Sequence, residues 1–239
     1  NWAHLTSLTI DEFSLTPGTY DRDYDTYDPP IWKDLLANIR DIGTAAYSNL
    51  HTLKLDSLVS VGDYALLSSG KSCPSLVEAS FKKLVSAGEG LLAYCPALAV
   101  VFLPLLEAIE NGGYGLLEGC SSLEEVSLPK LTIGSKYLLY NCSSLTTISI
   151  GTGLNPSEKT LSTGDMFLYD CPALTTLIIG IPVTLLGSSA FGDTTVPGNI
   201  TLWLCAAEMN NVSGNKWTTN ISGTQTEITF KEIKQIVNT

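Results

Sequence analysis

The feature that most constrains this chain is a repeated pattern, best seen in Cys120-Ser-Ser-Leu-Glu-Glu-Val-Ser-Leu-Pro129. Its skeleton is Cys-x-x-Leu, with apolar residues three and five positions after the leucine. Copies that begin with cysteine start at Cys73, Cys95, Cys120, Cys142 and Cys171. The anchor leucines, including one copy that lacks the cysteine, are Leu50, Leu76, Leu98, Leu123, Leu145 and Leu174. Successive anchors lie 22 to 29 residues apart, and such a period predicts a solenoid whose repeats must stack to bury their apolar faces.

Each repeat carries three local signals in the same order. The alternating apolar residues predict a short strand with one buried face. An apolar residue followed by glycine, as in Val61-Gly62 or Ile133-Gly134, predicts a bend that needs positive φ or a close backbone approach. A pair of apolar or aromatic residues, such as Leu91-Leu92, then predicts a short helical or 3₁₀ turn that leads to the cysteine. We therefore expect each coil to run strand, bend, short helical turn and back.

This order of signals resembles the leucine-rich repeats of the BspA-like family, whose unit reads roughly C-x-x-L-x-x-I-x-L-P-x-x-L-x-x-I-G-x-x-A-F-x-x-C. The segment from Cys120 to Cys142 fits this unit closely, and the resemblance covers roughly residues 1–205. It implies an α/β fold, a right-handed and horseshoe-like leucine-rich repeat solenoid. A parallel sheet is expected on the concave face, with short helical, 3₁₀ or irregular turns on the convex face.

The period also sets the expected domain organisation. Residues 1–205 should form one array, and residues 206–239 a capping segment that Trp217 pins to the last coil, because an open solenoid core needs a polar-faced cap. Residues 11–34 break the period and are predicted to be an inserted loop. The chain opens in mid-repeat at Asn1 without a signal peptide, so we expect it to be a piece of a longer protein.

The insertion holds the most chemically distinctive stretch, which runs from Tyr20 to Asp28. Aspartates at positions 21, 23, 25 and 28 suggest a calcium loop, but Thr26 and Trp32 stand where an EF-hand loop needs glycine and glutamate. Three interpretations stay open: a calcium site, a solvated acidic loop, or a protein-contact loop. In the last, the tyrosines would supply rigid contact area. They are Tyr20, Tyr24 and Tyr27.

The repeat cysteines should stack as a column of buried free thiols. Neighbouring coils lie about 4.8 Å apart, whereas the two Cβ atoms of a disulfide converge to about 3.5–4.5 Å. Metal ligands must converge on a point rather than form a column. We therefore predict that these cysteines act as small hydrophobic residues. Cys205 lies outside the column without an obvious partner.

Composition narrows the function. A formal net charge of −11 disfavours nucleic acid, which is bound through basic patches. The sequence contains no run of about 18 apolar residues, so we predict no transmembrane segment in it. The two histidines, His4 and His51, belong to no catalytic motif that we recognise. We expect no enzyme, no cofactor and no metal site outside the open question of the acidic loop.

The outward positions of the predicted strands, two and four residues after each anchor leucine, hold mostly serine and threonine. Those residues are also simply favourable in strands. Val100 and Phe102 are the apolar exception, and we predict that they contact a partner. The resemblance implies a non-enzymatic recognition or adhesion protein, extracellular or at the cell surface, that binds an extracellular or host protein. The alternative is a carbohydrate-binding or structural envelope module. The oligomeric state stays open.

Overall fold

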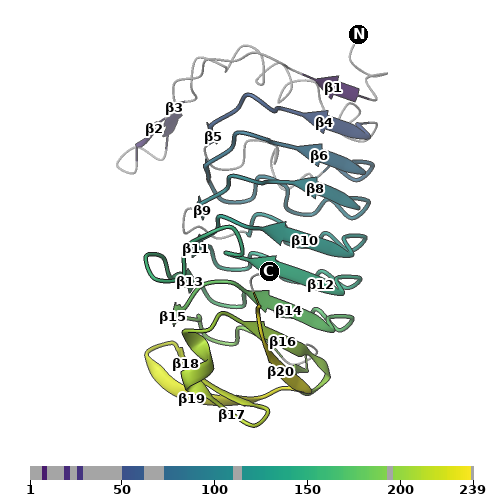
Figure 1. Cartoon of the computed structure of the whole chain (residues 1–239). Coiled ribbons are helices and arrows are strands. Elements are labelled where there is room, and N and C mark those ends of the chain that lie inside the picture. The colour runs from purple at the N-terminus through teal and green to yellow at the C-terminus, as the bar shows by residue number, and fades with distance from the viewer. Residues whose placement is uncertain are drawn as a thin grey trace.

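The computed structural model describes residues 50–61, 73–109, 115–192 and 196–237, and the backbone of short strands at 7–9, 19–21 and 26–28. Its coils stack one on another and build two ladders of parallel strands (Figure 1). The strands of the repeat motif form what we name the long-strand ladder: β1 (Ser7–Thr9), β4 (Thr52–Lys54), β6 (Glu78–Ser80), β8 (Val100–Phe102), β10 (Glu125–Leu128), β12 (Thr147–Ile150), β14 (Thr176–Ile179) and β16 (Thr201–Leu204).

The second ladder lies on the opposite side of each coil, and we name it the short-strand ladder (Figure 1). Its members are β5 (Ser60–Val61), β7 (Ser86–Ala87), β9 (Ala108–Ile109), β11 (Ile133–Gly134), β13 (Leu161–Thr163) and β15 (Val183–Leu185). The apolar side chains of both ladders point between them and form one continuous core. A parallel-sheet leucine-rich repeat solenoid is therefore the observed architecture, as the period predicted.

Equivalent repeat positions pair across the long-strand ladder, so the coils stack in phase. The outward residues Glu125, Thr147, Thr176 and Thr201 pair each with the next. The following residue in each strand points inward and is buried: Val126, Ile148, Leu177 and Leu202. Because successive side chains of a strand face opposite sides, the alternation in the sequence fixes which residues remain on the surface.

The predicted α/β class, horseshoe shape and helical convex side are not confirmed. Over the described ranges there is no α-helix, and the helical elements are two 3₁₀ turns, η2 (Pro197–Asn199) and η3 (Glu208–Asn211). The turns before Cys95, Cys142 and Cys171 are each bounded by two left-handed residues, as at Tyr137 (φ 55°) and Asn141 (φ 57°). A residue with positive φ interrupts a right-handed helical path, so only three residues remain between the two and no helix can form.

The bend glycines act through close approach. A Cβ atom on Gly164 would lie 2.5 Å from the backbone nitrogen of Lys136, and one on Gly187 would lie 2.2 Å from the carbonyl of Gly164. Gly134 occupies a different position, since it pairs with Thr163 one residue before Gly164. The two bend glycines therefore allow the backbones of neighbouring coils to touch, which is one of the two reasons that the sequence offered.

The cysteines are all free and buried, as predicted. The structure adds a role beyond packing, because thiols of the column donate hydrogen bonds to backbone carbonyl oxygens of the preceding coil. Cys120 Sγ lies 3.2 Å from the Leu92 oxygen, and Cys171 Sγ lies 3.0 Å from the Leu139 oxygen. A thiol can donate such a bond weakly, so the column satisfies carbonyl groups between coils while filling apolar space.

We expect these thiols to resist labelling in the native protein. The thiolate is the reactive form, and burial raises the pKa of Cys120 well above its ordinary value. A thiol reagent should therefore label none of the six cysteines within minutes under native conditions and all six in denaturant, as counted by intact mass. Rapid native labelling of the five column cysteines would contradict the buried column.

The last coil is followed by an antiparallel sheet of β17 (Val212–Ser213), β18 (Lys216–Ile221) and β19 (Thr224–Thr229). The chain then returns as β20 (Glu232–Gln235), which pairs with β16 in parallel and extends the long-strand ladder (Figure 1). Trp217 of β18 and Phe230 are fully buried in the same core as the repeats. The division of the chain at residue 205 into array and cap stays a prediction.

Candidate functional site

The candidate site is the outward side of β8, where Val100 and Phe102 are 54% and 49% exposed. The strand alternation puts them there, since Val101 between them packs against the core and Leu103 is buried in it. Equivalent positions of the other repeat strands hold mostly polar side chains, and the two large apolar exceptions, Ile178 and Trp203, are only partly exposed. We name the side chains of Val100 and Phe102 the β8 patch. It interrupts an otherwise largely hydroxyl-bearing and charged face of the long-strand ladder.

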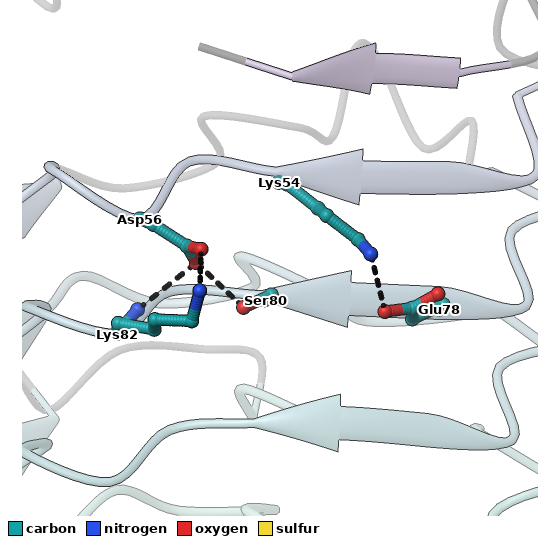
Figure 2. A network of polar contacts seen from close by, with 5 residues as sticks. All are labelled: Lys54, Asp56, Glu78, Ser80 and Lys82. Carbon is teal, nitrogen blue, oxygen red and sulfur yellow. Dashed lines mark hydrogen bonds and ion pairs between the residues drawn. The ribbon is translucent and has the colours of Figure 1, made fainter. Parts of the chain in front are cut away.

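On one side of the β8 patch lies a polar network that spans β4 and β6 (Figure 2). In register, Glu78 is beside Val100 and Ser80 is beside Phe102. Lys54 Nζ lies 2.9 Å from Glu78 Oε1, across the two strands.

The rest of the network surrounds Asp56. Lys82 Nζ lies 2.5 Å from Asp56 Oδ2, and Ser80 Oγ donates a 2.5 Å hydrogen bond to Asp56 Oδ1 (Figure 2). Partial burial raises the pKa of Asp56, but the hydrogen bonds from Lys82 and Ser80 outweigh that effect and lower it below its ordinary value. The carboxylate is therefore charged at neutral pH. Two lysines balance two carboxylates, so the polar network carries no net charge.

On the other side of the β8 patch lies β10, whose first residue is Glu125 and which Glu124 immediately precedes. Glu124 and Glu125 are both exposed. Neither takes part in an ion pair with any of the residues that the structure describes. Glu125 occupies in its repeat the position that Val100 occupies in the preceding one. The β8 patch thus lies between a neutral polar network and two carboxylates without a counter-charge.

The ladder is broken at this place. Strands β8 and β10 are neighbours but belong to separate hydrogen-bonded sheets, β1-β4-β6-β8 and β10-β12-β14-β16-β20. In the preceding coil, the Val77 oxygen accepts hydrogen bonds from the N–H groups of Ala99 (3.0 Å) and Val100 (3.1 Å). The Ala99 oxygen, the equivalent acceptor, receives no backbone bond from the described part of the chain. The coils remain joined through the short-strand ladder, where β9 pairs with β11.

The predicted contact tyrosines are placed only in part. Tyr20 and Tyr27 pair across an antiparallel hairpin of β2 (Thr19–Asp21) and β3 (Thr26–Asp28), an element that the sequence did not predict within the insertion. Tyr24 lies outside the described residues. So do Asp23 and Asp25, on which the calcium interpretation depends.

Among the described residues, two buried acidic residues escaped the sequence reasoning, Glu118 and Glu208. Glu118 is almost completely buried, and it accepts hydrogen bonds from the Tyr94 hydroxyl and from the Gly115 N–H (3.1 Å). Burial raises its pKa, although both hydrogen bonds act in the opposite direction. The position two residues before the cysteine holds lysine, alanine or tyrosine in the other repeats, so no local pattern pointed to it. Both oxygens bond within the chain, which makes Glu118 a link between two coils rather than a free acid.

The described residues contain no group of three or more histidine, cysteine, aspartate or glutamate side chains that could hold a metal ion. Over the same ranges, no helix has the length and apolar character needed to cross a bilayer. What the site can offer chemically is therefore apolar contact, surface charge and unpaired backbone groups.

The BspA type leucine rich repeat region matches residues 34–146 and 71–196 of the sequence in six copies. The chain belongs to the BspA-type leucine-rich repeat family. This confirms the family resemblance drawn from the cysteine and leucine spacing. No match was found among curated proteins.

Two solved structures of bacterial leucine-rich repeat proteins are similar to this BspA-type chain. One, from Bacteroides ovatus ATCC 8483, is 19% identical with a TM-score of 0.48, and the match covers 73% of this chain and 37% of that one. The other, from T. pallidum, is 19% identical with a TM-score of 0.38, and the match covers 59% of this chain and 74% of that one. Likenesses of this degree carry no implication for function.

Proposed function

We propose that this BspA-type array is a non-enzymatic recognition scaffold that binds an extracellular or host protein through the β8 patch. The observation that carries the proposal is the pair of large apolar side chains, Val100 and Phe102, each about half exposed on a polar ladder. Single exposed apolar residues are ordinary, but adjacent ones rimmed by polar groups are typical of interaction sites. Repeat solenoids use such extended sheet surfaces for binding.

The energetics favour a contact at this place. Complete burial of a valine or phenylalanine side chain is worth about 1.5–3 kcal/mol. Since about half of each side chain is already covered, a partner that buried the rest would gain on the order of 2 kcal/mol from the pair. The neutral polar network beside the patch can form a hydrated rim, as interfaces commonly have.

We place the protein outside the cell or at its surface, a location that the family membership supports. The buried thiols are compatible with an oxidising compartment, because burial shields them from oxidants. The tyrosines of the insertion, Tyr20, Tyr24 and Tyr27, remain a second proposed contact element.

The carbohydrate-binding alternative has less support. Sugar recognition by stacking needs an open aromatic ring face. Lys234 Nζ lies 5.1 Å from the centroid of Trp203, and the rings of Tyr140 and Tyr169 stack on each other at 5.4 Å. The aromatic faces of these residues are therefore at least partly engaged within the protein.

The proposal predicts that Phe102→Ser weakens partner binding at least tenfold while leaving the fold intact. Ile133→Ser is the matched control, because Ile133 is 48% exposed but lies on the short-strand ladder. Removal of an interface anchor commonly costs more than about 1.4 kcal/mol, which is a factor of ten. Surface substitutions usually change stability by less than about 0.5 kcal/mol.

A displayed random-peptide library selected on the wild-type protein supplies binders, and their affinities for each variant are then measured. Binding should fall for Phe102→Ser and Val100→Ser and change less than twofold for Ile133→Ser. Selected binders that tolerate Phe102→Ser, or that lose as much affinity with Ile133→Ser, would overturn the assignment of the site. Sensitivity to Tyr20→Ser or Tyr27→Ser alone would move the site to the hairpin.

A further inference from the structure

The geometry points to the chemistry of the partner: we infer that the β8 patch receives an extended protein segment with a lysine or arginine beside an apolar side chain. This inference rests on the proposed function and specifies its ligand. Its basis is the asymmetry of charge around the patch. On the β6 side, Lys54 and Lys82 are each paired with a carboxylate at 2.9 and 2.5 Å. On the β10 side, Glu124 and Glu125 are exposed and unpaired among the described residues.

Glu125 is close enough to act on the same ligand as the apolar pair. Strands β8 and β10 have Cα atoms within 8 Å of each other although they are not hydrogen-bonded, and alternate residues of one strand lie about 6.6–6.8 Å apart. Glu125 occupies the position of Val100 one strand further along. An extended ligand segment presents its residues i and i+2 on one face, also about 6.6–6.8 Å apart. One of them can therefore cover Val100 or Phe102 while the other reaches Glu125.

The apolar side chains and the carboxylates contribute differently to binding. Apolar contact with Val100 and Phe102 supplies most of the affinity. The polar groups around them act as the rim that commonly surrounds the apolar centre of an interface. Exposed ion pairs add little affinity but steer encounter and reject partners of the wrong sign. An acidic or uncharged segment would leave Glu124 and Glu125 without a counter-charge, so the site should discriminate by charge.

The broken ladder strengthens the case for a segment that lies across β8 and β10. Within the described residues, the Ala99 carbonyl has no backbone donor, whereas the equivalent carbonyls of other coils do. It is therefore available to a polar group of the ligand, such as an amide or an arginine side chain. Other occupants fit less well. A second copy of this chain brings a like net charge of −11, and nucleic acids and anionic lipid surfaces are repelled for the same reason.

The test uses short fluorescein-labelled peptides and the whole chain, with anisotropy as the measurement. The probe peptide repeats Leu-Ser-Lys-Ser, which puts leucine and lysine on one face when extended. The comparison peptides repeat Leu-Ser-Glu-Ser and Ser-Ser-Lys-Ser. We expect the leucine and lysine peptide to bind at least tenfold more tightly than either comparison peptide. We also expect its affinity to fall as salt is raised from 50 to 500 mM.

Two variants separate the ligand chemistry from the site. The double variant Glu124→Gln with Glu125→Gln should weaken the leucine and lysine peptide about three- to tenfold and flatten the salt dependence. Glu158→Gln, an exposed carboxylate on a loop outside the patch, is the control and should change nothing. Phe102→Ser should weaken the binding of every leucine-containing peptide at least tenfold while leaving the preference for the lysine peptide over the glutamate peptide unchanged.

The outcomes distinguish the two proposals. Equal binding of the lysine and glutamate peptides, both sensitive to Phe102→Ser, would overturn the charge inference and leave the site in place. Discrimination by charge that survives the double variant would overturn it as well. If the leucine and lysine peptide fails to bind, the inferred chemistry is wrong, and the peptides selected by display decide separately whether the site exists.

Discussion

Trp217→Ala is expected to lower the free energy of unfolding by about 3–5 kcal/mol, the usual cost of truncating a buried tryptophan. Trp217 is fully buried at the end of the solenoid, where its ring lies 6.3 Å from that of Phe230. Its Nε1 donates a 2.9 Å hydrogen bond to Glu208 Oε2. Glu208 is itself buried and also accepts bonds from the Val183 N–H (2.9 Å) and Asn211 Nδ2 (3.1 Å).

The size of this effect follows from two losses at once. Alanine leaves a cavity in the core, and it removes one of the donors that stabilise a buried carboxylate, whose desolvation then goes partly uncompensated. Trp203→Ala is the matched control, because Trp203 is only partly buried on the long-strand ladder under Lys234. It should cost about 1 kcal/mol.

Urea unfolding followed by circular dichroism measures both variants. Similar midpoints for the two would show that Trp217 does not anchor the C-terminal strands to the repeats. A Trp217→Ala variant that loses only a fraction of the signal at low urea would show that these strands unfold apart from the array. That result would support the proposed division at residue 205 between the repeat array and a separately unfolding cap.

Much of the fold could be predicted because its signals are local and repeated. The period of the anchor leucines set the stacking. The alternation within each strand decided that Val101 and Leu103 point inward and that Val100 and Phe102 point outward. The same reasoning predicted the cysteine column, since identical repeat positions stack at the strand spacing. These inferences need only the geometry of a strand and the presence of a neighbour.

The helical turns were wrongly predicted because the backbone conformation of some turn residues cannot be inferred from the residue type. Tyr137 and Met166 have left-handed backbone with φ of 55° and 54°, which is uncommon for such residues. Their side chains gave no warning that the turn would not be helical. The short-strand ladder was missed for a related reason. Two-residue strands such as β7 and β11 are too short to show a period of their own.

One part of the candidate site could be predicted from the sequence and another part could not. The apolar pair on β8 was visible in the sequence, because only an outward pattern was needed to find it. The significance of Glu124 and Glu125 was not visible, because it depends on which other charges are neutralised. Lys54 pairs with Glu78, and Lys82 with Asp56, across coils more than 20 residues apart in the chain. No one-dimensional rule gives that pairing, nor the interruption between β8 and β10.

Gly187→Ala is the second substitution expected to have a large effect, about 3 kcal/mol of lost stability. A Cβ atom at Gly187 would lie 2.2 Å from the carbonyl carbon and oxygen of Gly164 in the preceding coil. Backbone atoms cannot move aside as a flexible side chain can. The two coils must therefore separate locally, and overpacking of this kind usually costs about 1–3 kcal/mol or more.

The cost should appear as a loss of coupling between coils. In a solenoid each repeat is stabilised by its neighbours, so a weakened interface lets the terminal part open first. Gly134→Ala is the matched control, since its nearest neighbours are side-chain atoms at 3.4 Å and its φ is not in the left-handed region. That change should stay within about 1 kcal/mol of wild type. Hydrogen exchange should show faster opening of β15, β16 and β20 in Gly187→Ala than in Gly134→Ala. Equal protection in both variants would mean that the coils have room to accommodate a methyl group, and that the bend glycines are not required for their close stacking.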